Sequence, residues 1–130
     1  MKVAVIGVGN MGSNHARIYS EISNLVAVSD VNEALGRKVS EKFKCKFYKD
    51  YKEMLQKENV DAVSIVVPTS LHKEVALNVI EKRIPFLLEK PIADTVENAE
   101  EIIKKAREKG IQFMVGHIER FNPAVMKLKE

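Results

Sequence analysis

Short apolar runs alternate along the whole chain with longer segments in which apolar residues recur every three or four positions. The runs have the length of strands that are buried on both faces, and the segments between them have the period of helices with one apolar side. We expect six strands, at residues 3–6, 25–28, 46–48, 60–67, 85–88 and 111–115. Strands that alternate with helices predict an α/β fold, a doubly wound parallel sheet with helices on both faces.

The apolar stripes also predict which side of each helix faces the sheet. The first helix should begin near Asn10. The expected inward residues are Met11, His15, Ile18 and Ile22; Leu35, Val39 and Phe43; Val75, Ala76, Val79 and Ile80; and Val96, Ala99, Ile102, Ile103 and Ala106. The expected caps are Asp50 for a short helix over 50–55, Thr69 or Ser70, Asp94 with Glu97 reaching back, and Gly110 at the last helix end.

Three glycines follow the first apolar run at the spacing Gly-x-Gly-x-x-Gly. Gly7 permits a sharp turn, Gly9 lets phosphates approach the main chain, and Gly12 lets the helix pack closely. The free N–H groups of the first helical turn, which includes Asn10 and Met11, favour an anion together with the helix dipole. The turn is therefore a candidate phosphate cradle of a Rossmann dinucleotide-binding fold, although many folds share this spacing alone.

An aspartate ends the second apolar run, and Asp30 lies 18 residues after Gly12. In dinucleotide folds an acid near this place accepts hydrogen bonds from the adenosine ribose and repels a 2′-phosphate. Val31 and Asn32 follow without an arginine, which favours NAD over NADP; Arg37, a turn or more into the next helix, weakens that preference. A cap or turn role for Asp30 is compatible with the ribose role.

Further polar residues lie near the ends of later strands, at the edge where parallel sheets bind ligands. His72 is as consistent with a cofactor contact as with covering a helix end, whereas His15 is expected to be packed or half exposed. For Glu89 and Lys90, before Pro91, a site role is favoured over ordinary surface charge.

Composition excludes several classes of protein. The net charge of the 130 residues is +3, and lysines are scattered among glutamates, so we expect no nucleic-acid partner. No apolar run suits a membrane span or a signal peptide, so we expect a cytoplasmic location without membrane contact. We expect no metal site. The single cysteine, Cys45, excludes an internal disulfide. Between Lys44 and Lys46 it is either mildly activated or, as we expect, a packed small hydrophobe.

Five motifs occur in one order: Gly7-x-Gly9-x-x-Gly12; Asp30; Pro68-Thr69-x-x-His72; Glu89-Lys90-Pro91; and Gly116-His117-x-x-Arg120-Phe121-x-Pro123. Together they resemble the glucose–fructose oxidoreductase/inositol dehydrogenase (Gfo/Idh/MocA) family over essentially the whole chain, and Glu-Lys-Pro is the most specific of them. The resemblance implies an NAD(P)-dependent dehydrogenase of sugar, polyol or nucleotide-sugar alcohols. The last motif is most similar to members such as UDP-N-acetylglucosamine 3-dehydrogenases.

The resemblance also implies roles for particular residues. Lys90 would orient or deprotonate the substrate hydroxyl when the alcohol is oxidised, and a lysine serves as that base if burial and a positive neighbour lower its pKa. Glu89 would counter that effect, or turn away and help anchor the nicotinamide ribose. Arg120 would lie near the nicotinamide or the substrate. Pro68, Thr69 and His72 would line the cofactor cleft. The predicted partners are the nicotinamide dinucleotide, NAD rather than NADP, and a sugar-like or nucleotide-sugar substrate in the full enzyme.

Length is the main departure from the family pattern, because family members carry a second domain with the substrate pocket and the oligomer interface. We expect residues 1–120 to form the NAD-binding domain and residues 121–130 to start a truncated connecting helix. The chain alone should then turn over little or no substrate, and an oligomer is compatible with it. The alternatives are a stand-alone, non-catalytic NAD-binding sensor or partner subunit and, disfavoured by Glu89-Lys90-Pro91, a methyltransferase.

Overall fold

A computed structural model describes all 130 residues as a six-stranded sheet in the order β3-β2-β1-β4-β5-β6. Every neighbouring pair of strands is parallel. The elements are β1 (Lys2–Ile6), α1 (Asn10–Ile22), β2 (Asn24–Ser29), α2 (Glu33–Phe43), β3 (Lys46–Tyr48), α3 (Tyr51–Lys57), β4 (Ala62–Ile65), a 3₁₀ turn (Thr69–Leu71), α4 (His72–Glu81), β5 (Phe86–Leu88), α5 (Val96–Lys109), β6 (Phe113–Val115), a second 3₁₀ turn (Ile118–Phe121) and α6 (Pro123–Leu128). The predicted doubly wound α/β fold is confirmed, with all six strands near their expected places.

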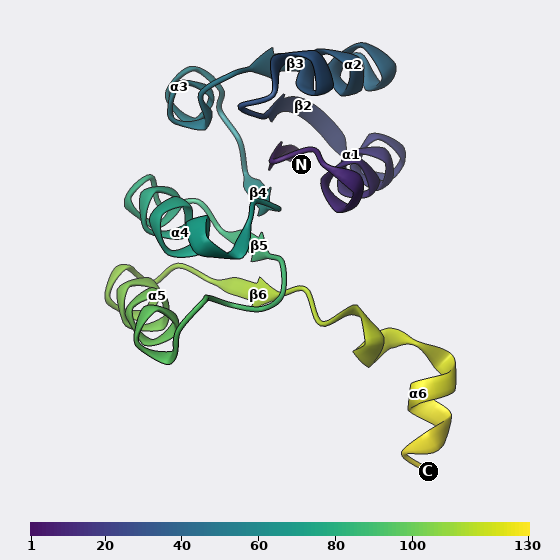
Figure 1. Ribbon diagram of the computed structural model, residues 1–130, viewed down its shortest axis with the longest axis vertical. Coiled ribbons are helices and arrows are strands. Elements are labelled where there is room, and N and C mark those ends of the chain that lie inside the picture. The colour runs from purple at the N-terminus through teal and green to yellow at the C-terminus, as the bar shows by residue number, and fades with distance from the viewer.

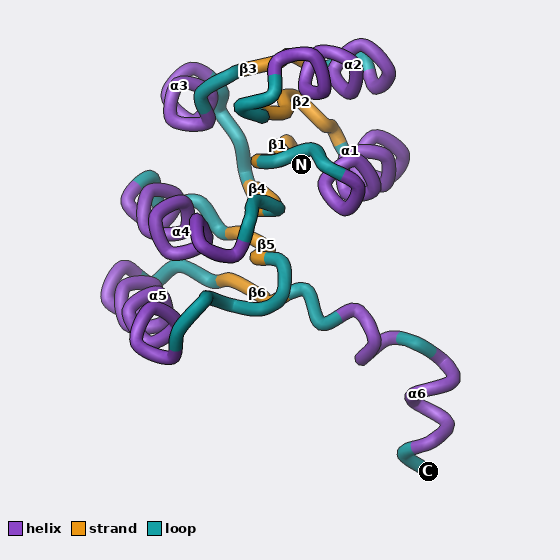
Figure 2. The backbone as a smooth tube through the Cα atoms, in the orientation of Figure 1, coloured by secondary structure: helices purple, strands orange, loops and turns teal.

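Helices cover the sheet from two sides, as Figure 1 shows. Helices α1 and α2 lie on one side, and α3, α4 and α5 lie on the other, while α6 projects away from the sheet. Because all strands are parallel, their carboxyl ends meet along one edge. We call this the ligand edge; it comprises the segments at residues 7–9, 30–32, 66–69, 89–91 and 116–117, most of them loops between strands and helices (Figure 2).

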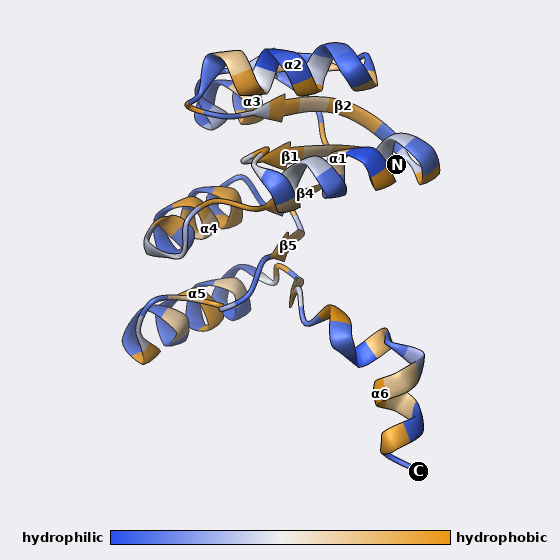
Figure 3. Ribbon diagram, turned by 45° about the vertical axis from the view of Figure 1, so that its right-hand side comes forward, coloured by the Kyte–Doolittle hydropathy of each residue, from blue (hydrophilic) through white to orange (hydrophobic).

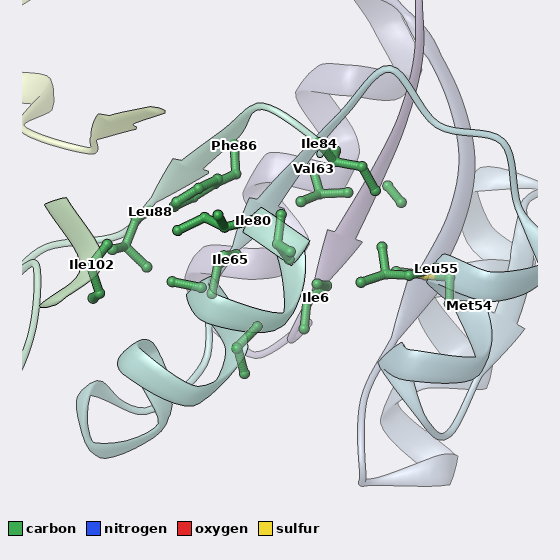
Figure 4. Packing of buried hydrophobic residues seen from close by; sticks show 14 of the residues in the cluster. Ile6, Met54, Leu55, Val63, Ile65, Ile80, Ile84, Phe86, Leu88 and Ile102 are labelled. Atoms are coloured by element: carbon green, nitrogen blue, oxygen red, sulfur yellow. The ribbon is translucent and has the colours of Figure 1, made fainter. Parts of the chain in front are cut away.

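The core lies in two clusters, one on each face of the sheet. The larger cluster contains 16 buried residues, contributed by the central strands and by α3, α4 and α5. Figure 4 shows Ile65, Ile80 and Leu88 packed together there, and all three are fully buried. Burying one such side chain contributes about 2 kcal/mol. The outward sides of the helices are hydrophilic in Figure 3. In outline, the helices therefore face the sheet with the apolar sides that the amphipathic pattern predicts.

The stripe predicted for α1 is wrong except at His15, whose side chain is 12% exposed and faces the sheet. Met11, Ile18 and Ile22 are exposed, and the residues of α1 that are buried are Gly12 and Ala16. Small residues face inward because the first turn of α1 lies directly against the main chain at Gly7. The inward stripes of α2 and α4 are as expected, with Val39, Val75, Ala76, Val79 and Ile80 buried, whereas Val96 at the start of α5 is exposed.

Two predicted helix caps are also wrong. Thr95 caps α5 by accepting a hydrogen bond from the Asn98 N–H, while Asp94 instead accepts from the Asn98 side-chain amide. Helix α4 has no side-chain cap, because a 3₁₀ turn over Thr69–Leu71 leads directly into it. The caps at Asp50 and Gly110 are confirmed: Asp50 accepts from the Lys52 N–H, and Gly110 is left-handed with φ 67°.

Candidate functional site

The glycine turn between β1 and α1 leaves no room for side chains at two of its three glycines. Gly7 has a φ of +90°, and a Cβ there would lie 2.2 Å from the carbonyl oxygen of Val66. A Cβ at Gly12 would lie 1.9 Å from the carbonyl oxygen of Gly7. Gly7 therefore allows the turn to lie against the loop after β4, and Gly12 allows α1 to pack on the turn, as the spacing predicts for Gly12.

Gly9 differs from the other two glycines because a Cβ added to it would have no atom within 4 Å. It is exposed at the N-cap of α1, where no side chain caps the helix and no acidic residue occupies the first turn. The first N–H groups of a helix have no partner within it, so those of Asn10 and Met11 are available to an external acceptor. The turn has the features of an anion site: main-chain donors, the positive end of a helix dipole and space in front of them.

Asp30 lies at the end of β2 and is tied to the glycine turn. One of its carboxylate oxygens accepts a hydrogen bond from the Val8 N–H at 2.9 Å, and the other accepts from the Asn32 N–H at 2.8 Å. The cap of α2 is Asn32, whose side chain accepts from the Leu35 N–H. Asp30 is therefore not the helix cap; it fixes the glycine turn to the loop after β2 and keeps a negative charge beside it.

The turn and Asp30 open on one cavity of about 420 Å³. Its other walls are Val31 and Asn32 on one side and residues 66–68 after β4 on the other. Tyr51 from α3 also contributes, and burial raises the pKa of its hydroxyl, which accepts a hydrogen bond from the Asn78 amide. The cavity thus combines apolar walls with a few fixed polar groups, as small-ligand sites do.

A second hollow of about 740 Å³ is larger but lacks such chemistry. It lies along β5 and β6 and is lined mainly by apolar residues such as Pro85, Leu87 and Met114. None of the three glycines nor Asp30 borders it. For a charged ligand, the smaller cavity at the glycine turn is the better candidate site.

The loop after β4 places Pro68 and Thr69 at the ligand edge and His72 beneath it. Pro68 is exposed and borders the cavity, and Thr69 is half exposed. His72 is only 1% exposed, and its two ring nitrogens lie 3.0 Å from the Val67 carbonyl oxygen and 3.3 Å from that of Ile92. The imidazole therefore joins the loop after β4 to the loop after β5.

Glu89 and Lys90 follow β5, and their side chains lie in different surroundings. Glu89 is 9% exposed, and its carboxylate accepts hydrogen bonds from the His15 imidazole at 2.9 Å and from the Lys90 N–H at 3.2 Å. The Lys90 side chain is exposed and takes part in no ion pair. The peptide bond from Lys90 to Pro91 is cis. The pair therefore presents a free amine at the ligand edge, with its neighbouring carboxylate turned inward.

The segment after β6 contributes Gly116 and Arg120. Gly116 is buried against the carboxylate of Glu89, whereas Arg120 is exposed in the second 3₁₀ turn with its guanidinium 6.0 Å from the centre of the Phe121 ring. The structure thus brings the glycine turn, Asp30 and Pro68 to one cavity and sets Glu89 and Lys90 farther along the same edge. Arg120 lies outside the residues that line the cavity.

Sequence reasoning missed the partners of His15. Its Nδ1 lies 3.0 Å from the Ser64 hydroxyl oxygen, which also lies 2.6 Å from the Tyr19 hydroxyl. Ser64 interrupts an otherwise apolar run, and that polar residue in a central strand was the available signal. His15 is half buried, as expected, but it joins α1 to the Glu89 carboxylate rather than only filling space.

Three further features concern the cysteine, metal binding and membrane spans. Burial raises the pKa of the Cys45 thiol to about 11, so this cysteine is the packed residue that we expected and not an activated one. No group of three or more His, Cys, Asp or Glu side chains is placed to hold a metal ion. None of the helices is both long and apolar enough to cross a bilayer.

A family model described as "Oxidoreductase family, NAD-binding Rossmann fold" matches residues 1–117. UDP-N-acetylglucosamine 3-dehydrogenase of Acidithiobacillus ferrooxidans is 37% identical over 130 residues, which are 100% of this chain and 41% of that protein. A solved structure of that enzyme has a TM-score of 0.93 over 99% of this chain and 41% of its own.

Relatives of lower sequence identity include an inositol dehydrogenase and a protein of antibiotic biosynthesis. Inositol 2-dehydrogenase of Mycolicibacterium smegmatis is 32% identical over 99% of this chain and 39% of its own length. The structure of GenD2 from gentamicin A biosynthesis, in complex with NAD, is 28% identical with a TM-score of 0.84, over 89% of this chain and 34% of that one. The chain thus spans about two fifths of the length of the two enzymes named from Acidithiobacillus ferrooxidans and Mycolicibacterium smegmatis.

Proposed function

The chain belongs to the Gfo/Idh/MocA family of oxidoreductases as an NAD-binding Rossmann domain, and from this premise we propose that it serves a dehydrogenase that oxidises a secondary alcohol of a sugar, polyol or nucleotide-sugar. One observation carries the proposal: the glycine turn, Asp30 and the free amine of Lys90 all lie along one edge of the sheet. The first two suit a dinucleotide, and the third suits proton transfer.

The residues at the glycine turn fit the dinucleotide. The open space at Gly9 and the uncapped start of α1 would receive the pyrophosphate, through the N–H groups of Asn10 and Met11. Asp30 would accept hydrogen bonds from the adenosine ribose, and its negative charge would disfavour the 2′-phosphate of NADP. Pro68 and Thr69 would form the opposite wall, which His72 supports from beneath by its contact with the Val67 carbonyl.

Lys90 supplies the chemistry of the proposed reaction. The bound nicotinamide would accept the hydride when the alcohol carbon is oxidised. The hydroxyl proton would then pass to the neutral form of the Lys90 amine, which is exposed and unpaired in this chain. Burial of Lys90 by the bound cofactor and substrate would favour that neutral form. Proton transfer by a positioned base contributes a factor of about 10² to 10⁴ to the rate. Arg120 would lie near the nicotinamide. Glu89 would affect the same part of the site through its position next to Lys90.

The relatives support the substrate class. The most similar of those described is named for UDP-N-acetylglucosamine, and another for inositol. Both names specify oxidation of a ring alcohol. Among these we propose a nucleotide-sugar, because the relative that is 37% identical over this chain is named for one. We also propose residues 1–120 as the cofactor domain.

Calorimetric titration of the chain with NAD and NADP tests the cofactor proposal. NAD should bind more tightly, and Asp30→Ala should weaken NAD about tenfold while changing NADP little. Asp61→Ala is the matched control, because Asp61 also accepts a main-chain hydrogen bond, from the Lys2 N–H, but outside the ligand edge. No binding of NAD at millimolar concentration, or an equal loss in both variants, would overturn the proposal.

Formation of NADH tests the reaction. In the protein that contains this chain, Lys90→Met should lower kcat with UDP-N-acetylglucosamine about 100-fold or more and leave NAD affinity within about threefold. Undiminished turnover by Lys90→Met would exclude the lysine as the base. Binding of NAD without turnover of any sugar, polyol or nucleotide-sugar would favour the alternative of a non-catalytic NAD sensor.

A further inference from the structure

Four polar side chains form a continuous hydrogen-bonded row from α1 to the ligand edge. The Tyr19 hydroxyl lies 2.6 Å from the Ser64 hydroxyl oxygen, and His15 Nδ1 lies 3.0 Å from the same oxygen. His15 Nε2 lies 2.9 Å from an oxygen of Glu89. We call Tyr19, Ser64, His15 and Glu89 the His15 network. It lies on the face of the sheet that α1 covers, and no side-chain polar atom buried within the protein lacks a partner.

The chemistry of the groups sets the direction of the hydrogen bond at Glu89. A carboxylate only accepts, so the hydrogen must come from His15 Nε2. This holds for the neutral ring, in which Nδ1 accepts from Ser64, and for the charged ring, in which Nδ1 donates. The side chains of His15 and Glu89 are each 12% exposed, so water competes little for this bond.

Gly116 closes the other side of the Glu89 carboxylate. A Cβ on Gly116 would lie 3.0 Å from one carboxylate oxygen, 3.2 Å from the carboxyl carbon and 3.3 Å from the second oxygen. That second oxygen also accepts from the Lys90 N–H at 3.2 Å. The carboxylate thus lies in a slot formed by His15, the glycine and the main chain, and it makes no ion pair with the Lys90 ammonium.

We propose that His15 is a positioning residue that holds the Glu89 carboxylate away from the amine of Lys90, and so keeps that amine free to react. The importance of a free amine for catalysis rests on the proposed function, but the positioning itself does not. A carboxylate one residue away that came within ion-pair distance would stabilise the ammonium form. Only the neutral amine accepts a proton from a substrate hydroxyl.

The reactivity of Lys90 toward a trace of acetic anhydride at fixed pH, in the chain without cofactor, tests this positioning. Mass spectrometry of the peptides would compare Lys90 with Lys104, which is exposed on α5 and unpaired. In His15→Leu the relative reactivity of Lys90 should fall about threefold or more, because the released carboxylate pairs with the ammonium. His15→Gln keeps a donor for Glu89 and should stay within about twofold of the unchanged chain.

The charge of Glu89 provides the decisive control. In a Glu89→Gln background, His15→Leu should leave the reactivity of Lys90 unchanged, because no carboxylate remains to be released. Gly116→Ala should lower the reactivity with His15 intact, since the added methyl displaces the carboxylate from its slot. Thermal unfolding of each variant identifies any that does not fold; if His15→Leu is one of them, Gly116→Ala and His15→Gln carry the test.

Two results would overturn the inference: unchanged Lys90 reactivity in folded His15→Leu or Gly116→Ala, or an equal fall with and without the Glu89 charge. The latter would show that His15 acts only by supporting the fold. Because the measurement uses neither cofactor nor substrate, it is independent of the proposed function. Failure of NAD to bind would remove the dehydrogenase proposal and leave this inference in place.

Discussion

On the β1–β2 side of the ligand edge, main-chain atoms meet directly, because Gly12 packs on the carbonyl of Gly7. The side chains that form hydrogen bonds there bond to main-chain groups: Asp30 accepts from two N–H groups, and Ser13 donates to the Val8 carbonyl. On the β4–β6 side, side chains make the connections. His72 joins two loops through their carbonyl groups, and His15 reaches Glu89 from another helix. The first side therefore depends on the absence of side chains, and the second on particular ones.

The main-chain side should be the less tolerant of change. Gly12→Ala should lower the free energy of unfolding by about 3 kcal/mol, because the added methyl meets a carbonyl oxygen that cannot move without shifting the turn. Gly9→Ala is the matched control, with nothing near its added methyl, and should cost about 1 kcal/mol or less. Urea denaturation of both measures the difference. Equal losses would show that close main-chain packing does not distinguish this side.

The side-chain side should respond next, through His72. A neutral imidazole has one N–H and donates to one of the two carbonyl oxygens near its ring, so His72→Leu should lower the free energy of unfolding by about 1 kcal/mol. His117→Leu changes an exposed histidine and should alter stability by less than about 0.5 kcal/mol. The same urea titration measures both. A loss in His72→Leu as small as in the control would mean that the loops hold each other without the imidazole.

The smallest effect should come from the far end of the His15 network. Tyr19→Phe and Ser64→Ala each remove one partner of the same hydrogen bond, so their costs should fail to add by about 0.5 kcal/mol or more. Tyr51→Phe removes a matched hydroxyl bonded to Asn78 instead. Its cost should add to that of Ser64→Ala within about 0.3 kcal/mol. Additive costs for Tyr19 and Ser64 would show that the contact carries no coupling.

The same contrast explains how far the sequence could predict the molecule. Glycine spacing and the place of Asp30 report on local main-chain geometry, so both can be recognised within a few tens of residues. The apolar runs likewise locate the four central strands, β1, β2, β4 and β5, because a strand buried on both faces needs little but apolar side chains. The sequence thus predicted the fold and one side of the ligand edge.

The other side could not be predicted in the same way. His15 lies 49 residues from Ser64 and 74 residues from Glu89, and no local pattern links positions so far apart. The period of α1 was also misleading, because its most apolar positions face outward while Gly12 and Ala16 face the sheet. Close approach of helix to turn selects small residues there, which a search for large apolar ones overlooks.

The central place of β1 has a consequence for synthesis of the protein. β1 leaves the ribosome before the other five strands, but one of its two neighbours is β4, whose Ile65 pairs with Ile6. Parallel pairing over such a separation is slow, since a long loop must close before the contacts form. Until residue 65 has emerged, one edge of β1 and its apolar side chains stay uncovered, and such edges invite aggregation. The nascent chain is therefore vulnerable until β4 has emerged, and a chaperone that binds short apolar strands would protect it there.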